Sequence, residues 1–206
     1  MMTIFYEVHK GLYVNLTNQC PCACTFCLRN DMDRIGRTGS LWLDHTPSLE
    51  EVLAEMKNWD LSKYDEIVFC GFGEPTCAFD VLIETARIIK RDYGTPIRIN
   101  TNGLGNLVNG RNILPEMAGL IDTLSISLNT PDAQEYFNTC RPKFGVESHR
   151  AMLDFAREAV QYVPNIVMTT VDTTLSREEE ARCAAICEEM GVKYRIRPWE
   201  SADHHN

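Results

Sequence analysis

The feature of this sequence that most limits its fold is the regular alternation of strand-like and helix-like segments along the chain. The stretches between the predicted strands carry apolar residues at helical spacing. Strictly alternating strands and helices favour parallel strands with helices covering the outside. The predicted strands span residues 12–17, 66–70, 97–101, 123–128, 166–171 and 193–197.

Two of the predicted helices begin with the sequence of a capping box. Ser48 and Glu51 have the three-residue spacing of this motif, and so do Ser176 and Glu179. The second box precedes a helix that ends before Gly191, and the first precedes an apolar stripe. The stripe consists of Leu49, Val52, Leu53, Met56 and Trp59, and further helices are predicted at 80–92, 113–119 and 147–162.

Several predicted strands alternate apolar and polar residues. Ile97 and Ile99 alternate with Arg98 and Asn100, and residues 14–17 and 124–129 follow the same pattern. A parallel strand with both faces buried is instead a nearly continuous apolar run. If helices cover the apolar face, the polar residues line a concave interior, as in a curved sheet that holds a polar ligand. The alternative, an antiparallel sheet with one solvated face, is disfavoured by the intervening helices.

The number of strand–helix units narrows the fold class. Six units are too few for an eight-unit barrel. The expected fold is therefore α/β, either a partial (β/α)6 barrel with parallel strands inside and helices outside or an open doubly wound sheet. No shift in composition divides the chain, so residues 1–206 are predicted to form a single domain, with a disordered polar tail at 201–206.

Composition excludes several classes of function. No apolar run approaches the roughly 18 residues of a membrane span, and the N-terminus lacks the pattern of a signal peptide, so we expect a cytoplasmic protein without membrane partners. The net charge of −9 gives no global field that favours nucleic acid. In a reducing cytoplasm, the nine cysteines point to metal binding or catalysis rather than to disulfides.

Four of the nine cysteines lie in the segment 20–27. Cys20, Cys24 and Cys27 form a C-x3-C-x2-C triplet, and Cys22 lies between them. Three thiolates on so short a loop can hold three irons of an iron–sulfur cubane and leave the fourth iron open. Zinc is the main alternative, and the pair Cys24 and Cys27 would then need two further ligands. The remaining thiols are interpreted as structural: Cys70, Cys77 and Cys140 as isolated residues, and Cys183 and Cys187 as one buried helix face.

A glycine-rich turn follows the second predicted strand, at residues 70–76. Gly71 and Gly73 would let a ligand approach the main chain, and the adjacent Glu74 carboxylate can accept hydrogen bonds from an ammonium group. At the carboxyl edge of a parallel strand this combination is typical of a ligand site. It is not a P-loop, since the Gly-Lys-Ser/Thr sequence is absent. The alternative is a tight strand-to-helix turn without a ligand.

Together, these motifs resemble those of the radical S-adenosylmethionine (radical SAM) enzymes. The resemblance rests on a C-x3-C-x-aromatic-C loop after the first strand and a Gly-Glu-Pro turn after the second, and it continues in residues 100–103 and 125–129. Within the superfamily, the runs 15–20, 71–76 and 140–145 are similar to the TatD-associated radical SAM proteins.

The resemblance implies a role for each of these residues. Cys20, Cys24 and Cys27 would ligate a [4Fe–4S] cluster whose open iron binds the methionine moiety of SAM. Gly73 and Glu74 would receive the methionine amino group. The remaining SAM contacts implied are Arg141 at the carboxylate, Asn102, Ser127 and Asn129 near the ribose, and Phe26 with the backbone near Arg197 and Pro198 at the adenine.

The activity implied is reductive cleavage of SAM to a 5′-deoxyadenosyl radical, which abstracts hydrogen from an unidentified small-molecule or protein substrate. An electron donor of the flavodoxin or ferredoxin type is the implied partner. The alternatives are an activase of a glycyl-radical protein, a non-catalytic iron–sulfur or zinc module, and a nucleotide-binding α/β domain. The segment 29–43 is our candidate for substrate or partner contact, with Arg29, Arg34 and Arg37 as a local basic patch. The five histidines are scattered and predicted not to be catalytic.

Overall fold

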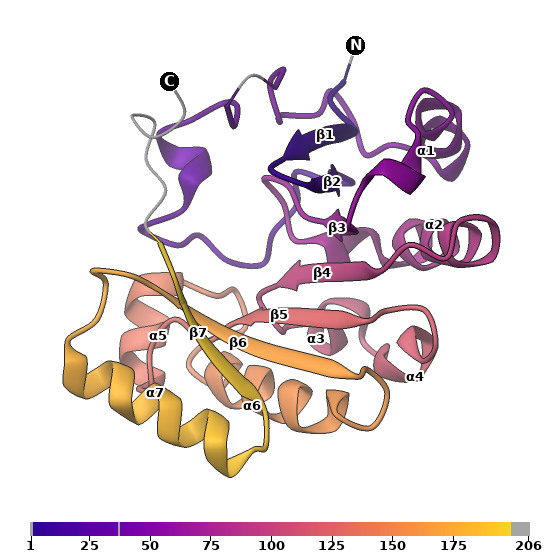
Figure 1. The fold of residues 1–206 in the computed structure, drawn as a ribbon. Helices are drawn as coiled ribbons and strands as arrows, with labels where there is room; N and C mark the ends of the chain where they lie inside the picture. The colour runs from indigo at the N-terminus through magenta and orange to yellow at the C-terminus, as the bar shows by residue number, and fades with distance from the viewer. Residues whose placement is uncertain (1, 37, 199–206) are drawn as a thin grey trace.

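The computed structural model of the chain describes residues 2–36 and 38–198, so the tail predicted at 201–206 and the residue Arg37 lie outside the described residues. Within these residues the strands form one seven-stranded sheet in the order β1-β2-β3-β4-β5-β6-β7 (Figure 1). Strands β2 to β7 are parallel to their neighbours, and β1 pairs antiparallel to β2. The sheet is not closed into a barrel, since β1 and β7 are its two edges. The strands are β1 (Phe5–Val8), β2 (Gly11–Val14), β3 (Glu66–Phe69), β4 (Ile97–Thr101), β5 (Thr123–Ser127), β6 (Asn165–Val171) and β7 (Lys193–Arg197).

The α/β fold and the open, mostly parallel sheet confirm the predicted partial barrel. The strand predicted at residues 12–17 corresponds to β2 (Gly11–Val14), which is shorter than predicted. Strand β1 was not predicted at all. This strand forms a hairpin with β2 through a turn in which His9 has a positive φ of 53°. A hairpin strand has no helix between it and its partner, so it breaks the alternation from which the other six strands were predicted.

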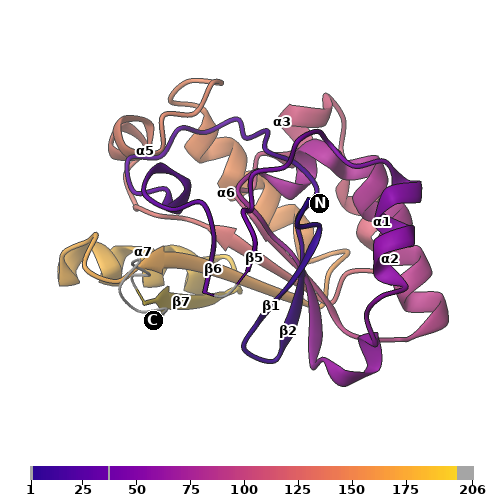
Figure 2. The same cartoon turned by 90° about the horizontal axis from the view of Figure 1, so that it is seen from above.

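Helices connect the parallel strands and cover one side of the sheet, and the view from above shows its curvature (Figure 2). Both predicted capping boxes are present, at Ser48 and Glu51 and at Ser176 and Glu179. The short α3 and the two-turn α5, which begins at the cap residue Asp132, were not predicted. The helices are α1 (Leu49–Met56), α2 (Phe79–Asp92), α3 (Gly105–Asn109), α4 (Leu114–Met117), α5 (Ala133–Cys140), α6 (Ser148–Ala159) and α7 (Arg177–Glu189), with 3-10 turns η1 (Leu28–Asn30), η2 (Leu61–Lys63) and η3 (Pro75–Ala78).

The alternating pattern of the strands separates an apolar face from a polar one. On β4, Ile97, Ile99 and Thr101 are buried, whereas Arg98 and Asn100 are half-buried on the opposite face. Arg98 donates to both carboxylate oxygens of Glu66 on β3, at 3.0 and 2.6 Å, and to Oδ1 of Asn100 at 2.6 Å. Hydrogen bonds and an ion pair among its own side chains thus hold the polar face together. The cysteine loop follows β2, and the glycine-rich turn follows β3.

Candidate functional site

The cysteine segment lies against the C-terminal end of α5. The backbone amides of Ala23 and Thr25 donate to the carbonyls of Cys140 and Thr139, at 3.0 and 2.9 Å. The amide of Lys143 donates in the other direction, to the carbonyl of Pro21 at 2.8 Å. Three backbone hydrogen bonds therefore fix a loop that has no helix or strand of its own between residues 20 and 27.

Four thiols interact where this loop meets the end of α5. The backbone amide of Cys22 donates to the sulfur of Cys20 at 3.4 Å, the sulfur of Cys24 lies 3.7 Å from the carbonyl of Cys140, and hydrogen bonding couples the thiol of Cys22 to those of Cys20 and Cys24 and the thiol of Cys24 to that of Cys140. These bonds lower the pKa of Cys24, through Cys140 first and Cys22 second, and the bond from Cys22 lowers the pKa of Cys20. The same bonds raise the pKa values of the donors Cys22 and Cys140. Two thiols of the predicted triplet are thus stabilised as thiolates, the form in which cysteine binds metal.

Exposure separates the predicted ligands from the two other thiols at this loop, although Cys70 and Cys77 elsewhere in the chain are also partly exposed. Cys20, Cys24 and Cys27 are each partly exposed, whereas Cys22 is buried, 5% exposed, and Cys140 is fully buried. Burial raises the pKa of Cys27. All nine cysteines, each of them within the described residues, are free. Across residues 2–36 and 38–198, no three His, Cys, Asp or Glu side chains converge as a single metal ion would require. Three cysteine thiols on one loop are a donor set that can hold three irons of a cluster, whereas a structural zinc ion would need a fourth ligand.

Close packing against the segment before the cysteine loop accounts for both glycines of the turn at 70–76. A side chain at Gly71 would lie 2.0 Å from Oδ1 of Asn15, and one at Gly73 would lie 2.1 Å from the carbonyl oxygen of Thr17. The backbone amide of Glu74 then donates to the carbonyl of Gln19 at 2.7 Å. The turn and the start of the cysteine loop are therefore packed as one unit.

The Glu74 carboxylate is directed into this unit. It is 4% exposed and accepts four hydrogen bonds. They come from the amide and hydroxyl of Thr76 at 3.1 and 2.8 Å, the hydroxyl of Thr101 at 2.7 Å and the backbone amide of Asn102 at 2.7 Å. Burial raises the pKa of Glu74, and the four donors act against that effect. The side chain thus joins the turn to the end of β4, and its hydrogen bonds are made within the protein.

Asn102 links this carboxylate to the thiols. Its side-chain amide lies 3.8 Å from the sulfur atoms of both Cys20 and Cys22, and its Oδ1 accepts from the amide of Leu104 at 3.0 Å. The side chain that was expected near a ribose therefore faces the cysteine loop.

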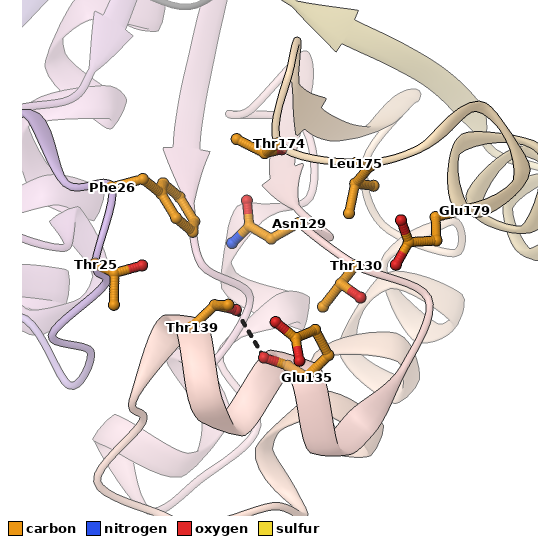
Figure 3. Close-up of a pocket in the computed structure, with 9 residues that line it drawn as sticks. All are labelled: Thr25, Phe26, Asn129, Thr130, Glu135, Thr139, Thr174, Leu175 and Glu179. Carbon is orange, nitrogen blue, oxygen red and sulfur yellow. Dashed lines mark hydrogen bonds between the residues drawn. The ribbon is translucent and has the colours of Figure 1, made fainter.

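A cavity of about 290 Å³ adjoins the cysteine loop at the carboxyl ends of β5 and β6 (Figure 3). Phe26 lies on one side, opposite Leu175 and Glu179, with Asn129 between them. Asn129 has a positive φ of 64° and donates to the sulfur of Cys140 at 3.3 Å. Its Oδ1 is buried and has no hydrogen-bond partner among the described residues. A buried acceptor without a donor at the wall of a cavity suits a ligand that carries a hydroxyl or an amino group. The cavity is lined by Thr25, Phe26, Asn129, Thr130, Glu135, Thr139, Thr174, Leu175 and Glu179.

The structure brings some of the predicted site residues together and leaves others apart. Phe26 and Asn129 share the cavity, whereas Ser127 is half-buried at the end of β5 and does not line it. Arg141 is exposed and lines a separate hollow with Phe137, Asn138 and Pro142. Neither Arg197 nor Pro198 lines the cavity, where Thr174 and Leu175 lie beyond β6 instead.

Cys140 is the residue of this site that the sequence analysis missed. It is not isolated, because its sulfur accepts from Asn129 and its carbonyl lies 3.7 Å from the sulfur of Cys24. The left-handed conformation of Arg141, with φ 46°, ends α5 and turns the chain toward Lys143, which bonds to the cysteine loop. Among the described histidines, His149 is buried, and its ring bonds to the carbonyl of Thr130 at 3.1 Å.

Within the part of the chain that the structure describes, none of the helices combines the length and apolar character that crossing a bilayer requires.

Comparison with known proteins identifies relatives at the level of family and fold. The family model described as Radical SAM superfamily matches residues 14–180. A probable dual-specificity RNA methyltransferase RlmN of Dictyoglomus turgidum is 28% identical over 97 residues, which cover 44% of this chain and 25% of that protein.

Solved structures share the fold at low sequence identity. SuiB of Streptococcus suis, bound to the precursor peptide SuiA, superposes with a TM-score of 0.67 at 18% identity over 98% of this chain and 42% of its own. A radical SAM methyltransferase from Sphaerobacter thermophilus gives a TM-score of 0.64 at 14% identity, over 97% of this chain and 70% of its own. The chain thus spans a quarter of this curated relative and less than half of SuiB.

Proposed function

Because its residues 14–180 match the family model, the chain belongs to the radical SAM superfamily, and we propose that it cleaves S-adenosylmethionine reductively at the site described above. Enzymes of this superfamily use a [4Fe–4S] cluster and SAM. When bound, this pair supplies a 5′-deoxyadenosyl radical by one-electron cleavage of the sulfonium C–S bond, with methionine as the other product. The protein itself orients these groups and excludes water.

Cys20, Cys24 and Cys27 are the proposed ligands of the cluster. The observation that carries the proposal is their partial exposure on one anchored loop, while the neighbouring Cys22 is buried. The neighbouring thiols support the choice, because interaction with Cys22 lowers the pKa of Cys20 and, after that with Cys140, the pKa of Cys24, which favours their thiolate forms. Cys22 is then a hydrogen-bond donor in the loop and not a ligand.

The cavity beside Phe26 is the proposed site of the adenosine portion of SAM. The aromatic ring provides an apolar wall for a base, and the unpartnered Oδ1 of Asn129 is an acceptor for a ribose hydroxyl. Ser127 stays a proposed contact at the end of β5. Arg141 stays a proposed partner of the SAM carboxylate. It lines a separate hollow, and this position does not support that role.

The glycine-rich turn is the proposed contact of the methionine amino group. The backbone carbonyl of Gly73 is the proposed acceptor, since the carbonyl of Glu74 already accepts from the amide of Cys77 at 2.9 Å and the Glu74 side chain accepts four hydrogen bonds. We propose that this side chain orients the turn for SAM. Asn102 faces Cys20 and Cys22, so its proposed contact is the part of SAM that lies next to the cluster and not the ribose.

The three sequence runs that are similar to the TatD-associated proteins meet at this site. Asn15 packs against Gly71, and Cys140 and Lys143 bond to the cysteine loop. This contact supports a place in that subgroup and a single radical SAM core domain for residues 1–206. The proposed partners are a one-electron donor of the flavodoxin or ferredoxin type and a small-molecule or protein substrate.

Product analysis tests the type of reaction. The reconstituted protein is incubated anaerobically with SAM and a strong reductant, with and without a candidate substrate, and the nucleoside products are separated. Release of 5′-deoxyadenosine is expected from hydrogen abstraction. Formation of S-adenosylhomocysteine together with 5′-deoxyadenosine would instead indicate methyl transfer, the reaction named for the RlmN relative and for the Sphaerobacter protein.

A further inference from the structure

Arg29 occupies an unusual position two residues after the last cysteine of the triplet. It lies in η1, and its guanidinium donates to three backbone carbonyls from three different segments. Nη1 donates to the carbonyl of Asn18 at 3.4 Å and to that of Phe72 at 3.3 Å. Nη2 donates to the carbonyl of Cys22 at 3.2 Å.

These three carbonyl groups belong to the segments that the proposed function requires to lie close together. Asn18 precedes the cysteine loop, Cys22 lies in its middle, and Phe72 belongs to the turn between the two glycines. None of the ion pairs formed by the described residues involves Arg29.

The guanidinium is well suited to such a role. Its donors form a rigid planar fork that can bond to several acceptors at fixed angles, whereas a lysine ammonium is a compact charge on a flexible stem. A cation beside an iron–sulfur cluster also stabilises the added electron, because the cluster becomes more negative when it is reduced.

We propose that Arg29 is a positioning residue, which fixes the cysteine loop to the SAM-binding turn and favours the reduced cluster by its charge. The proposal rests on the proposed function. It replaces the sequence-based interpretation of Arg29 as part of a basic patch for a substrate or partner, because the side chain is turned inward onto backbone carbonyls.

The same segment provides a matched control. Arg34 belongs to the same predicted patch, but its side chain is 62% exposed and pairs with its neighbour Asp33 at 3.2 Å. Three variants separate geometry from charge: Arg29→Gln removes both the fork and the charge, Arg29→Lys keeps the charge alone, and Arg34→Gln removes an exposed charge from the same segment.

The first measurement is amide hydrogen exchange in the metal-free protein, since it needs neither cluster nor SAM. Both Arg29 variants are expected to exchange faster than wild type at residues 20–27 and 71–74, because the bridge between these segments is lost. Arg34→Gln is expected to match wild type. Protection unchanged in both Arg29 variants would overturn the positioning role.

The second measurement uses the reconstituted protein. At equal iron content, Arg29→Gln and Arg29→Lys should each weaken SAM binding at least tenfold, whereas Arg34→Gln should not. The equilibrium constant for one-electron reduction of the cluster should fall about tenfold in Arg29→Gln only. This corresponds to a shift of the reduction potential by about 59 mV to a more negative value. Equal affinity and potential in Arg29→Gln and Arg34→Gln would contradict the proposal.

The two measurements also distinguish an error in the role proposed for Arg29 from an error in the proposed function. If wild type binds no cluster or SAM, the proposed function is wrong, while the exchange data still decide whether Arg29 joins the two segments. If wild type binds both and the Arg29 variants behave as wild type, the inference alone is wrong. Should Arg29→Gln fail to fold, Arg29→Lys decides the positioning role from exchange and affinity.

Discussion

The carboxylate of Glu74 accepts a hydrogen bond of 2.7 Å from the backbone amide of Asn102. This bond connects the glycine-rich turn after β3 with the end of β4. Since the side chain of Asn102 lies 3.8 Å from the sulfur of Cys20, the turn, the strand end and the cysteine loop share one continuous set of contacts. The carboxylate is thus an internal support of the proposed site.

The variant Glu74→Gln tests this support. Glutamine keeps the length of the side chain but places an amide nitrogen, which is a donor, opposite one of the four donors. A buried donor without an acceptor costs about 1–3 kcal/mol, so the free energy of unfolding should fall by that amount. Chemical denaturation of the metal-free protein measures this change. Glu74→Ala should in addition weaken SAM binding while the cluster is retained, and unchanged stability and affinity in both variants would remove Glu74 from the site.

Substitution of single cysteines tests the choice of ligands. Cys20→Ala, Cys24→Ala and Cys27→Ala should each lose the reconstituted cluster, because a cubane held by two cysteines is poorly retained. Cys22→Ala should keep most of the iron, since its thiol is buried and donates hydrogen bonds. Iron content and the visible absorption spectrum are the measurements. Equal loss of iron from all four variants would show that Cys22 is also a ligand.

Filling the cavity tests the proposed adenosine site. Leu175→Trp places a larger side chain opposite Phe26 and should weaken SAM binding at least tenfold, with iron content unchanged. The control is Leu107→Trp, at a leucine that is 41% exposed and lies outside the cavity lining. Isothermal titration of the reconstituted protein gives both affinities. If the two variants bind SAM equally well, the adenosine portion lies elsewhere.

The stability of the protein should depend on pH through His149. Burial lowers the pKa of this imidazole below its ordinary value of 6.5, and the neutral ring bonds to the carbonyl of Thr130. Because the unfolded chain takes up the proton more readily, this contribution to stability is present above pH 6.5 and is lost as the pH falls through that value toward the folded pKa.

Denaturation midpoints at pH 5 and pH 8 measure the effect. Wild type should lose more stability between these values than His149→Gln, whose amide can still donate to the Thr130 carbonyl but does not titrate. The same pH dependence in both proteins would assign the effect to other groups.

Much of this fold is predictable from local patterns. The alternation of segments indicated the parallel sheet, and Ser48 with Glu51 and Ser176 with Glu179 marked two helix starts that the structure confirms. These features depend on residues a few positions apart. Strand β1 escaped prediction because it forms a hairpin, and α5 escaped because its apolar pattern covers only eight residues.

The site was less predictable where it depends on tertiary contacts. Cys140 appeared isolated because it is far from the triplet along the chain, and only the docking of α5 brings it to Cys24. Similarly, Gly73 is required by the carbonyl of Thr17, a contact that no local motif encodes. Arg29 followed a cysteine motif in sequence, but its three carbonyl acceptors were visible only in the fold.

Release of 5′-deoxyadenosine tests the central claim most directly. The purified protein is reconstituted anaerobically with iron and sulfide, and the nucleoside is quantified after addition of SAM with and without a strong reductant. The account predicts about four irons per chain and 5′-deoxyadenosine that appears only with the reductant and is absent from the Cys24→Ala variant. Stoichiometric zinc in the purified protein, with no cleavage of SAM after reconstitution, would contradict it.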